Sequence, residues 1–390
     1  MNAKVILPGA TLGVMGGGQL GRMFVQAAQS MGYFTAVLDP DLTSPAGLVA
    51  HYHIATDYLD EQGLAQLMQR CAAITTEFEN VPAGALVTLG AYRRVAPAAD
   101  GVAVCQDRYA EKAWFRRCGV PCAPHALIDT HERLVAVSDE LLPGILKTSR
   151  LGYDGKGQRR VSNRAELAEA WQQLGQRPCV LEKLLPLALE LSVLVARSAT
   201  GQTVQLPVQQ NLHRDGILAV TQVPSPDATL AQQSLASQAA SALAEAMDYV
   251  GVLCVEFFVL VDGSLVANEM APRPHNSAHW SIDGSDISQF ELQVRTLTGL
   301  PLTAPRQHSA AVMLNLLGDL WFVDGGAEKT PPWALVLALP GVHLHLYGKA
   351  SARPGRKMGH LTITGLDAAG TRNTALQAAE ILGLPTWSAA

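Results

Sequence analysis

Two glutamates in the second half of the chain have the types and spacing that could bind a metal ion. Glu256 and Glu269 lie in apolar runs separated by Asp262-Gly263, and that dipeptide between apolar runs predicts a two-residue hairpin turn. If the turn residues face each other, residues whose numbers add to 525 are opposite, and the two glutamates are such a pair. Like charges in opposite positions destabilise paired strands, whereas Mg²⁺ prefers one or two carboxylates together with phosphates. The pattern predicts a divalent-cation site, and the alternative is a one-residue bulge that turns one glutamate toward water.

Several side chains that could bind an anion follow Glu269 directly. They are Arg273, His275, Asn276, Ser277 and His279, and Pro272 and Pro274 stiffen the backbone between them. So many anion-binding groups beside a predicted metal pair indicate an active site.

A glycine-rich stretch near the N-terminus has nearly the spacing of a dinucleotide-binding loop. Gly16, Gly18 and Gly21 lie between a predicted strand over 11–15 and a predicted helix over 19–31, and Asp39 follows a strand over 34–38. This pattern is typical of an NAD-dependent oxidoreductase. It is also compatible with a glycine turn that lets any anion meet a helix N-terminus.

A second glycine-rich stretch, from Leu151 to Gln158, has a different spacing. It contains three glycines and follows a predicted strand over 143–148 that carries Lys147. The backbone N–H groups of such a loop can wrap phosphates, although the order of residues differs from a P-loop. The alternative is a surface hairpin.

Two acidic residues that follow the second glycine-rich stretch are candidates for binding a nucleoside. Glu182 and Glu190 lie on predicted strands over 179–185 and 189–196. They could accept hydrogen bonds from an adenine amine and a ribose, or they could be solvated strand edges.

Basic and polar residues also gather in two predicted loops. The run 203–210 is hairpin-like, with Asn211, His213 and Arg214 expected in its turn. The Pro/Gly-containing loop over 349–360 is rich in basic residues in an otherwise acidic protein, which indicates an anionic ligand or, alternatively, a solvated charged loop.

The elements that must position these residues fall into three sections of chain. Strands and helices alternate over the first hundred residues, with a third strand over 73–79, and such alternation predicts a parallel sheet covered by helices. Later helices are predicted over 106–117, over 163–174 with Asn163 as its cap, and over 229–247, and a strand over 343–347.

The composition is that of a well-buried globular protein of two or three domains. The 390 residues are 48% hydrophobic and 16% charged, with a net charge of −5 and a pI near 6.1, which argues against a general nucleic-acid or membrane-surface binder. No apolar run reaches the roughly 18 residues that span a bilayer, and the N-terminus lacks a convincing signal-peptide plan. The six cysteines are scattered, and we expect buried thiols without a metal or redox role. We expect a cytoplasmic protein with no nucleic-acid or membrane partner.

Taken together, the motifs resemble those of the ATP-grasp ligases and, more closely, those of the N5-carboxyaminoimidazole ribonucleotide synthetases. The matching runs are colinear and span nearly the whole chain: 16–21 (GGGQLG), 76–80 (TEFEN), 106–108 (QDR), 151–157 (LGYDGKG), 210–213 (QNLH), 268–277 (NEMAPRPHNS) and 349–356. The family usually has glycine where this chain has Ala278.

The resemblance implies a reaction, its cofactors and its partners. 5-Aminoimidazole ribonucleotide, bicarbonate and ATP would give the N5-carbamate, ADP and phosphate through carboxyphosphate, in de novo purine biosynthesis. Glu256 and Glu269 would hold Mg²⁺ or Mn²⁺, and the protein would be a homodimer.

The resemblance also implies roles for individual residues. ATP would contact Arg108, Lys147, Gly152, Tyr153, Asp154, Gly155, Lys156, Gly157, Gln158, Glu182, Lys183, Leu184, Leu185, Glu190, His213, Asn268 and Glu269. The ribonucleotide and bicarbonate would contact Gly18, Gln19, Leu20, Glu77, Tyr153, Arg273, His275, Asn276, Ser277, Lys349 and Arg356. Catalysis would depend on Arg273, His275, Lys147 and Glu269.

The implied fold is the ATP-grasp fold, of mixed α/β and α+β class. An N-terminal parallel-sheet domain would span 1–105, the ATP-grasp domain 106–308 with a lid over about 121–185, and a small β-rich C-terminal domain 309–390. The alternatives are another ATP-grasp ligase, such as a formate-dependent glycinamide ribonucleotide transformylase, an NAD-dependent oxidoreductase, and a non-catalytic nucleotide sensor.

Overall fold

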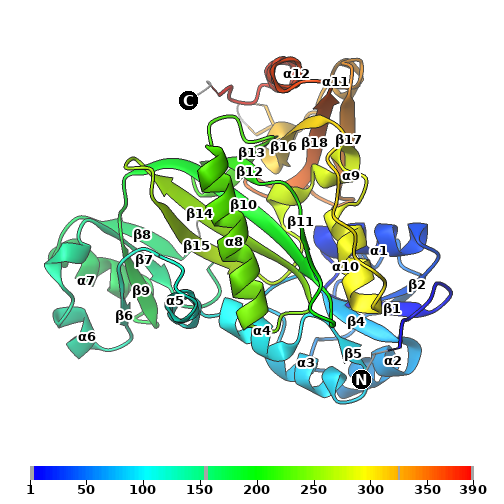
Figure 1. The fold of residues 1–390 in the computed structure, drawn as a ribbon, viewed down its shortest axis with the longest axis horizontal. Coiled ribbons are helices and arrows are strands. Elements are labelled where there is room, and N and C mark those ends of the chain that lie inside the picture. The colour runs from blue at the N-terminus through cyan, green and yellow to red at the C-terminus, as the bar shows by residue number, and fades with distance from the viewer. Residues whose placement is uncertain (1–3, 153–156, 324–325, 388–390) are drawn as a thin grey trace.

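The computed structural model describes residues 4–152, 157–323 and 326–387. Strands in these ranges form three sheets, of five, nine and four strands. Figure 1 shows the nine-stranded sheet in the middle, the five-stranded sheet at the lower right and the four-stranded sheet at the left. The sheet in the middle therefore borders both of the others.

The N-terminal sheet is parallel, in the order β3-β2-β1-β4-β5. Its elements are β1 (Thr11–Met15), α1 (Gln19–Ser30), β2 (Phe34–Leu38), β3 (Tyr52–Ile54), α2 (Glu61–Arg70), β4 (Ala73–Thr76), α3 (Ala83–Gly90), β5 (Arg94–Val95) and α4 (Ala99–Cys105). The predicted parallel sheet is confirmed, and β1 and β2 have the predicted bounds. The predicted third strand is three residues too long, since β4 ends at Thr76.

The four-stranded sheet is antiparallel, in the order β6-β9-β7-β8. Its section of chain contains α5 (Arg108–Arg117), β6 (His125–Ile128), α6 (His131–Val135), η1 (Asp139–Leu141), β7 (Gly144–Thr148), β8 (Gln158–Val161), α7 (Arg164–Gln173) and β9 (Cys179–Lys183). The predicted cap is confirmed, because the Asn163 side chain accepts a hydrogen bond from the Glu166 N–H.

The central sheet has the order β15-β14-β10-β12-β13-β16-β18-β17, and β11 also pairs with β10. Its strands are β10 (Leu187–Arg197), β11 (Thr203–Gln205), β12 (Gln209–Arg214), β13 (Ile217–Val223), β14 (Gly251–Leu260), β15 (Leu265–Ala271), β16 (Ala310–Leu317), β17 (Val342–Leu346) and β18 (Lys357–Gly365). The helices of this section are α8 (Leu230–Ala246), η2 (Asn276–Ala278), α9 (Ser281–Gly284), α10 (Gln289–Thr298), η3 (Gly318–Trp321), α11 (Trp333–Leu337) and α12 (Ala368–Leu382). The C-terminal strands β16, β17 and β18 belong to the same sheet, because β16 pairs with β13.

Alternation along β10 explains how the sheet presents polar groups. Leu191, Val193 and Val195 are buried in the core that includes α8, while Leu194 lies in the core that includes α10. Successive side chains of a strand point to opposite faces. Ser192 therefore lies on the same face as Leu194, on the side away from α8.

The β14–β15 hairpin has a different turn from the predicted one. The loop contains three residues, Val261 to Gly263, because the Leu260 N–H donates to Ser264 O at 2.8 Å, and Gly263 has a φ of +83°, as in three-residue hairpin loops. A bulge beside Asn268 then shifts the register by one. Glu256 and Glu269 are therefore directly opposite, as predicted, but two departures from the predicted register cancel each other.

The prediction of a turn containing Asn211, His213 and Arg214 is wrong. All three lie on β12, and the turn follows at Asp215 and Gly216. The sequence of this strand resembles a turn because five of its six residues are polar, although Gln209, Gln210 and Asn211 are buried.

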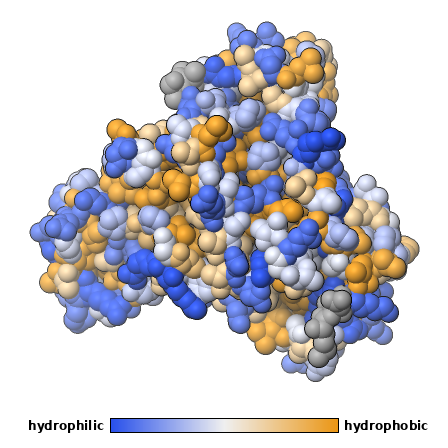
Figure 2. Space-filling model, viewed as in Figure 1, coloured by the Kyte–Doolittle hydropathy of each residue, from blue (hydrophilic) through white to orange (hydrophobic). Residues whose placement is uncertain are grey.

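No helix in the described residues is long and apolar enough to cross a membrane. On the face shown in Figure 2, hydrophilic and hydrophobic residues are interspersed over the surface.

Candidate active site

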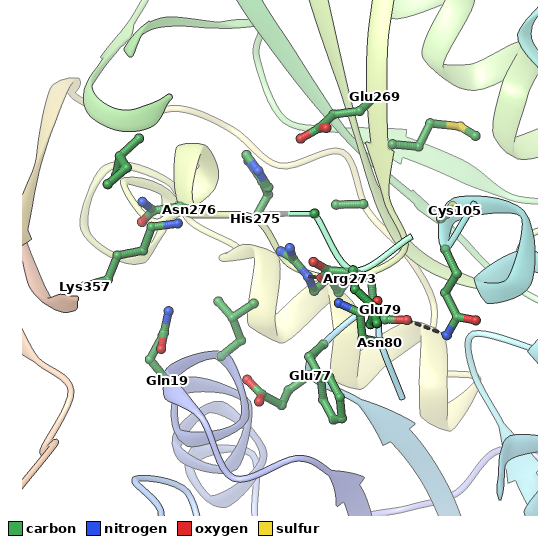
Figure 3. A pocket seen from close by; sticks show the side chains of 18 of the residues that line it. Gln19, Glu77, Glu79, Asn80, Cys105, Glu269, Arg273, His275, Asn276 and Lys357 are labelled. Carbon is green, nitrogen blue, oxygen red and sulfur yellow. Dashed lines mark hydrogen bonds and ion pairs between the residues drawn. The ribbon is translucent and has the colours of Figure 1, made fainter. Parts of the chain in front are cut away.

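Two cavities adjoin at the central sheet. One, of about 710 Å³, is lined by α1, the segment after β4, β15 and the loop before β18, and we call it the N-terminal cavity. The other, of about 720 Å³, is lined by strands of the four-stranded sheet and by β10, β12 and β14, and we call it the lid cavity. The residues that line both are Arg108, Glu269, His275, Asn276 and Lys357. Figure 3 shows the N-terminal cavity, with Gln19 and Glu77 across from Glu269 and with Arg273 and His275 between them.

The glutamate pair lies where the two cavities meet. Burial raises the pKa of Glu256 to about 7, and the charge on Glu269 adds to this rise. Burial acts in the same direction on Glu269, but the Arg108 guanidinium, 2.8 Å from Glu269 Oε2, outweighs it and lowers the pKa of Glu269 to about 2. Two opposed carboxylates in this position fit a divalent cation. In the described part of the chain no group of three or more His, Cys, Asp or Glu side chains could hold a metal ion.

The two histidines beside the glutamate pair differ in charge. His213 hydrogen-bonds to Glu190, and although burial lowers the pKa of His213, Glu190 outweighs burial and raises it to about 9. The Nε2 atom of His275 lies 3.3 Å from Glu256 Oε1, but burial, with help from Arg273, lowers the pKa of His275 to about 3. At neutral pH His213 is a cation and His275 is a neutral hydrogen-bonding group.

A buried ion-pair network includes Lys147 and Glu182, which line the lid cavity. Glu182 Oε2 lies 3.0 Å from Lys147 Nζ, and Glu182 Oε1 lies 3.5 Å from Lys112 Nζ. Burial raises the pKa of Glu182, but the two lysines outweigh it and lower this pKa to about 2. Lys112 also donates to the Asn268 carbonyl at 2.6 Å. The network ties α5, β7, β9 and β15 together.

The N-terminal glycine loop binds carboxylates of the protein itself. Gly17 N–H donates to Asp39 Oδ2 at 2.7 Å, and the N–H groups of Gly18 and Gly21 donate to Glu77 at 3.1 and 3.3 Å. The amides that would bind a dinucleotide pyrophosphate therefore have internal partners. This arrangement disfavours the NAD-dependent oxidoreductase, and it leaves Glu77 at the wall of the N-terminal cavity.

Cationic side chains dominate two other walls of the N-terminal cavity. Arg273 forms an ion pair with Glu79, and burial acts to raise the pKa of Glu79 but Arg273 lowers it. From the loop before β18, Lys349, Arg353 and Arg356 line the cavity. This wall suits an anionic group such as a phosphate.

Most of the predicted site residues line the two cavities. Gln19, Leu20, Glu77, Gly152, Arg273, Lys349 and Arg356 line the N-terminal cavity, and Lys147, Gln158, Glu182, Lys183, Leu184, Leu185, Glu190, His213, Glu256 and Asn268 line the lid cavity.

Of the predicted site residues that the structure describes, three line neither cavity. Gly18 donates its N–H to Glu77, which lines the N-terminal cavity, and the Gly157 carbonyl accepts from the Thr148 N–H. Ser277 is fully buried beneath His275. Ala278, at the family's usual glycine, is fully buried in η2. Tyr153, Asp154, Gly155 and Lys156 lie outside the described residues.

Four charged residues of the site were not predicted individually, although Lys357 belongs to the basic loop over 349–360 and Glu79 to the matching run 76–80. Glu79 binds Arg273, Lys112 contacts Glu182, Glu111 accepts a hydrogen bond from the Met270 N–H, and Lys357 lines both cavities. One signal was available for Lys112, because it lies four residues after Arg108 and therefore on the same face of α5.

This geometry can bring two anionic ligands together. A phosphate chain in the lid cavity and a phosphorylated ligand in the N-terminal cavity would both reach Glu269, Arg108 and His275. Such a site is suited to phosphoryl transfer, which depends on positioning and charge neutralisation.

Comparisons with known proteins agree with this arrangement. Three family models match consecutive sections: a ribonucleotide synthetase preATP-grasp domain over 9–106, an ATP-grasp domain over 113–290 and a phosphoribosylaminoimidazole carboxylase C-terminal domain over 311–374. An N5-carboxyaminoimidazole ribonucleotide synthase of Brucella melitensis is 42% identical over 93% of this chain and 98% of its own length.

Solved structures agree as well. The chain matches an ADP complex of an N5-carboxyaminoimidazole ribonucleotide synthetase with a TM-score of 0.90 and 37% identity, covering 98% and 99% of the two chains. It matches the Aspergillus clavatus enzyme in complex with ADP and 5-aminoimidazole ribonucleotide with a TM-score of 0.86 and 29% identity, covering 96% and 98%. The predicted ATP-grasp fold is confirmed and the oxidoreductase alternative is wrong: the chain belongs to the N5-carboxyaminoimidazole ribonucleotide synthases, a family of ATP-grasp ligases.

Proposed function

We propose that this protein uses ATP and bicarbonate to carboxylate the amine of 5-aminoimidazole ribonucleotide, giving N5-carboxyaminoimidazole ribonucleotide, ADP and phosphate. The observation that carries the proposal is the glutamate pair at the junction of two cavities, one suited to a nucleotide and the other walled by cations. The ligands of the Aspergillus clavatus structure support the same substrates.

The lid cavity would bind ATP. Lys147, 8% exposed and paired with Glu182, would contact the phosphates together with the glycine-rich stretch between β7 and β8. Leu184 and Leu185, between β9 and β10, would contact the adenine. His213, a cation beside the glutamate pair, would add positive charge near the phosphates.

Glu256 and Glu269 would hold Mg²⁺ on the phosphates. When bound, the ion would neutralise charge on the γ-phosphate and its leaving group. Arg108 already compensates the charge of Glu269, so a cation between the carboxylates would chiefly lower the pKa of Glu256, which burial raises.

The N-terminal cavity would bind the ribonucleotide and bicarbonate. Lys349 and Arg356 would bind the 5′-phosphate, and Gln19, Leu20 and Glu77 would contact the rest of the nucleotide. Arg273, fixed by Glu79, and His275 would hold bicarbonate between the two ligands.

The chemistry then takes two steps. A bicarbonate oxygen attacks the γ-phosphorus and ADP leaves, which forms carboxyphosphate. The ribonucleotide amine attacks the carboxyl carbon, the C–O bond to phosphate breaks, and the nitrogen loses a proton. Arg273 would stabilise the developing oxyanions, and enclosure of the site would keep water from the labile intermediate.

The proposal is tested by ADP release with Mg²⁺-ATP and bicarbonate, with and without the ribonucleotide, for the wild type and Glu269→Gln. We expect release that depends on the ribonucleotide and is abolished by the substitution. Release that is indifferent to the ribonucleotide but still abolished by Glu269→Gln would support another ATP-grasp ligase and refute the substrate. No ADP release under any condition would refute the proposal and favour a non-catalytic nucleotide sensor.

The resemblance to the family further supports a homodimer in the cytoplasm. Sedimentation equilibrium of the purified protein would test the dimer, since a single species of about 41.5 kDa, the mass of one chain, would contradict it.

A further inference from the structure

A line of buried polar side chains runs from His275 across one face of the central sheet. The Nδ1 atom of His275 lies 2.9 Å from Ser277 Oγ, which lies 2.8 Å from Ser192 Oγ. The Asn211 side-chain amide donates to Ser192 Oγ at 2.9 Å, and Thr221 Oγ1 donates to Asn211 Oδ1 at 2.9 Å. Ser192, Ser277 and Thr221 are fully buried.

The register of the sheet places this line beside the glutamate pair. Glu269 is opposite Glu256, Glu256 is opposite Ser192, and Ser192 is opposite Gln209. Directly paired residues point to the same face of a sheet. Four neighbouring strands thus present one polar row on the face that carries His275.

The donors and acceptors along the line have defined directions. The Ser277 backbone N–H, which can only donate, points at His275 Nδ1 at 3.3 Å, so Nδ1 is an acceptor and the ring proton is on Nε2. Thr221 fixes the orientation of the Asn211 amide. With Asn211 donating to Ser192 and Ser192 to Ser277, the Ser277 hydroxyl is left to donate to Nδ1. Gln209 Oε1, 3.0 Å from Ser192 Oγ, competes for the Ser192 proton.

This tautomer determines what His275 offers to the site. Nε2–H faces Glu256 at the junction of the cavities. A neutral ring with its proton on Nε2 donates a hydrogen bond there and cannot take a proton at that atom. The ring is therefore suited to stabilise an oxyanion.

We propose that Ser192 and Ser277 are positioning residues that hold His275 as the Nε2–H tautomer, so that it donates a hydrogen bond to the oxygen atoms of bicarbonate and carboxyphosphate. The catalytic consequence rests on the proposed function, whereas the tautomer does not. Hydrogen-bond partners of a functional histidine commonly fix its tautomer and its ring orientation.

The test is the tautomer of His275 by ¹⁵N NMR of histidine-labelled protein, with His275→Gln to assign its signals. We expect the wild type to show protonated Nε2 and unprotonated Nδ1 at neutral pH. In Ser192→Ala the Ser277 hydroxyl loses its donor and can accept from Nδ1–H. Only the long 3.3 Å contact from the Ser277 backbone N–H then favours the Nε2–H tautomer, so a population of the other tautomer appears. The kcat should fall about 10-fold without a change in the KM for ATP.

A matched control is Ser225→Ala, because Ser225 is also buried but donates to the Val208 carbonyl, away from His275. It should change neither the tautomer nor kcat. An Nδ1–H tautomer in the wild type would overturn the proposal, and so would equal effects of the two substitutions. If Ser192→Ala does not fold, the wild-type tautomer still decides. If the protein does not carboxylate the ribonucleotide, the NMR result stands and only the catalytic role is lost.

Discussion

Substitution of Lys112 should lower the free energy of unfolding by a clearly measurable amount. Its side chain is fully buried and bridges Glu182, at 3.5 Å, and the Asn268 carbonyl, at 2.6 Å. Lys112→Met has a similar length and no charge. The substitution would leave Glu182 Oε1 without its cation and the Asn268 carbonyl without its donor.

The expected cost follows from these contacts. At an effective dielectric constant of about 20, charges 3.5 Å apart attract by roughly 5 kcal/mol. Removal of one partner from a buried pair costs about 3–5 kcal/mol in practice, because the other charge remains buried. Lys147 still pairs with Glu182 at 3.0 Å, so we expect the lower end, about 3 kcal/mol of unfolding free energy.

Urea denaturation without nucleotide, followed by tryptophan fluorescence, would measure this loss. Lys183→Met is the matched control, because Lys183 is an exposed lysine next to Glu182 on β9, and such surface changes cost within about 0.5 kcal/mol. A loss for Lys112→Met no larger than that of Lys183→Met would refute the account of the buried network.

Three further predictions concern protonation and packing. Glu190 outweighs burial and raises the pKa of His213 to about 9. The protonated His213 therefore stabilises the fold fully below its unfolded pKa of about 6.5, and this contribution is lost as pH rises through about 9. His213→Gln should therefore flatten the dependence of the urea midpoint on pH between these values. Burial holds the pKa of His360 well below 6.5, so stability should fall as pH drops below about 6.5; thermal melts of His360→Phe should show a smaller fall than the wild type. A Cβ at Gly21 would lie 2.7 Å from the Gly16 carbonyl oxygen, so Gly21→Ala should lower the free energy of unfolding by about 1–3 kcal/mol. It should also raise the KM for the ribonucleotide more than that for ATP, and equal changes in both KM values would contradict this.

Local patterns predicted the elements and many of the site residues. Alternation of strands and helices predicted the N-terminal parallel sheet, and the asparagine before α7 predicted its cap. These features depend on neighbouring residues. The pairing of Glu256 with Glu269 was also correct, but only because the bulge beside Asn268 compensates for the three-residue loop. A register depends on turn geometry and bulges, which composition specifies weakly.

Long-range partners could not be predicted in this way. The contact of Lys112 with Asn268 spans 156 positions, and that of Arg273 with Glu79 spans 194. The acids Glu79 and Glu182 are bound by cations that only the packed sheets bring near. His213 was assigned to a turn because polar residues on a buried strand resemble a loop.

The central claim is that bicarbonate attacks ATP before the amine attacks carbon. Freshly prepared ¹⁸O-labelled bicarbonate, supplied with ATP and 5-aminoimidazole ribonucleotide, would test it by mass analysis of the released phosphate. Attack through carboxyphosphate predicts that each phosphate carries one oxygen from bicarbonate. Phosphate without label, formed at the same rate as the carboxylated product, would contradict the account.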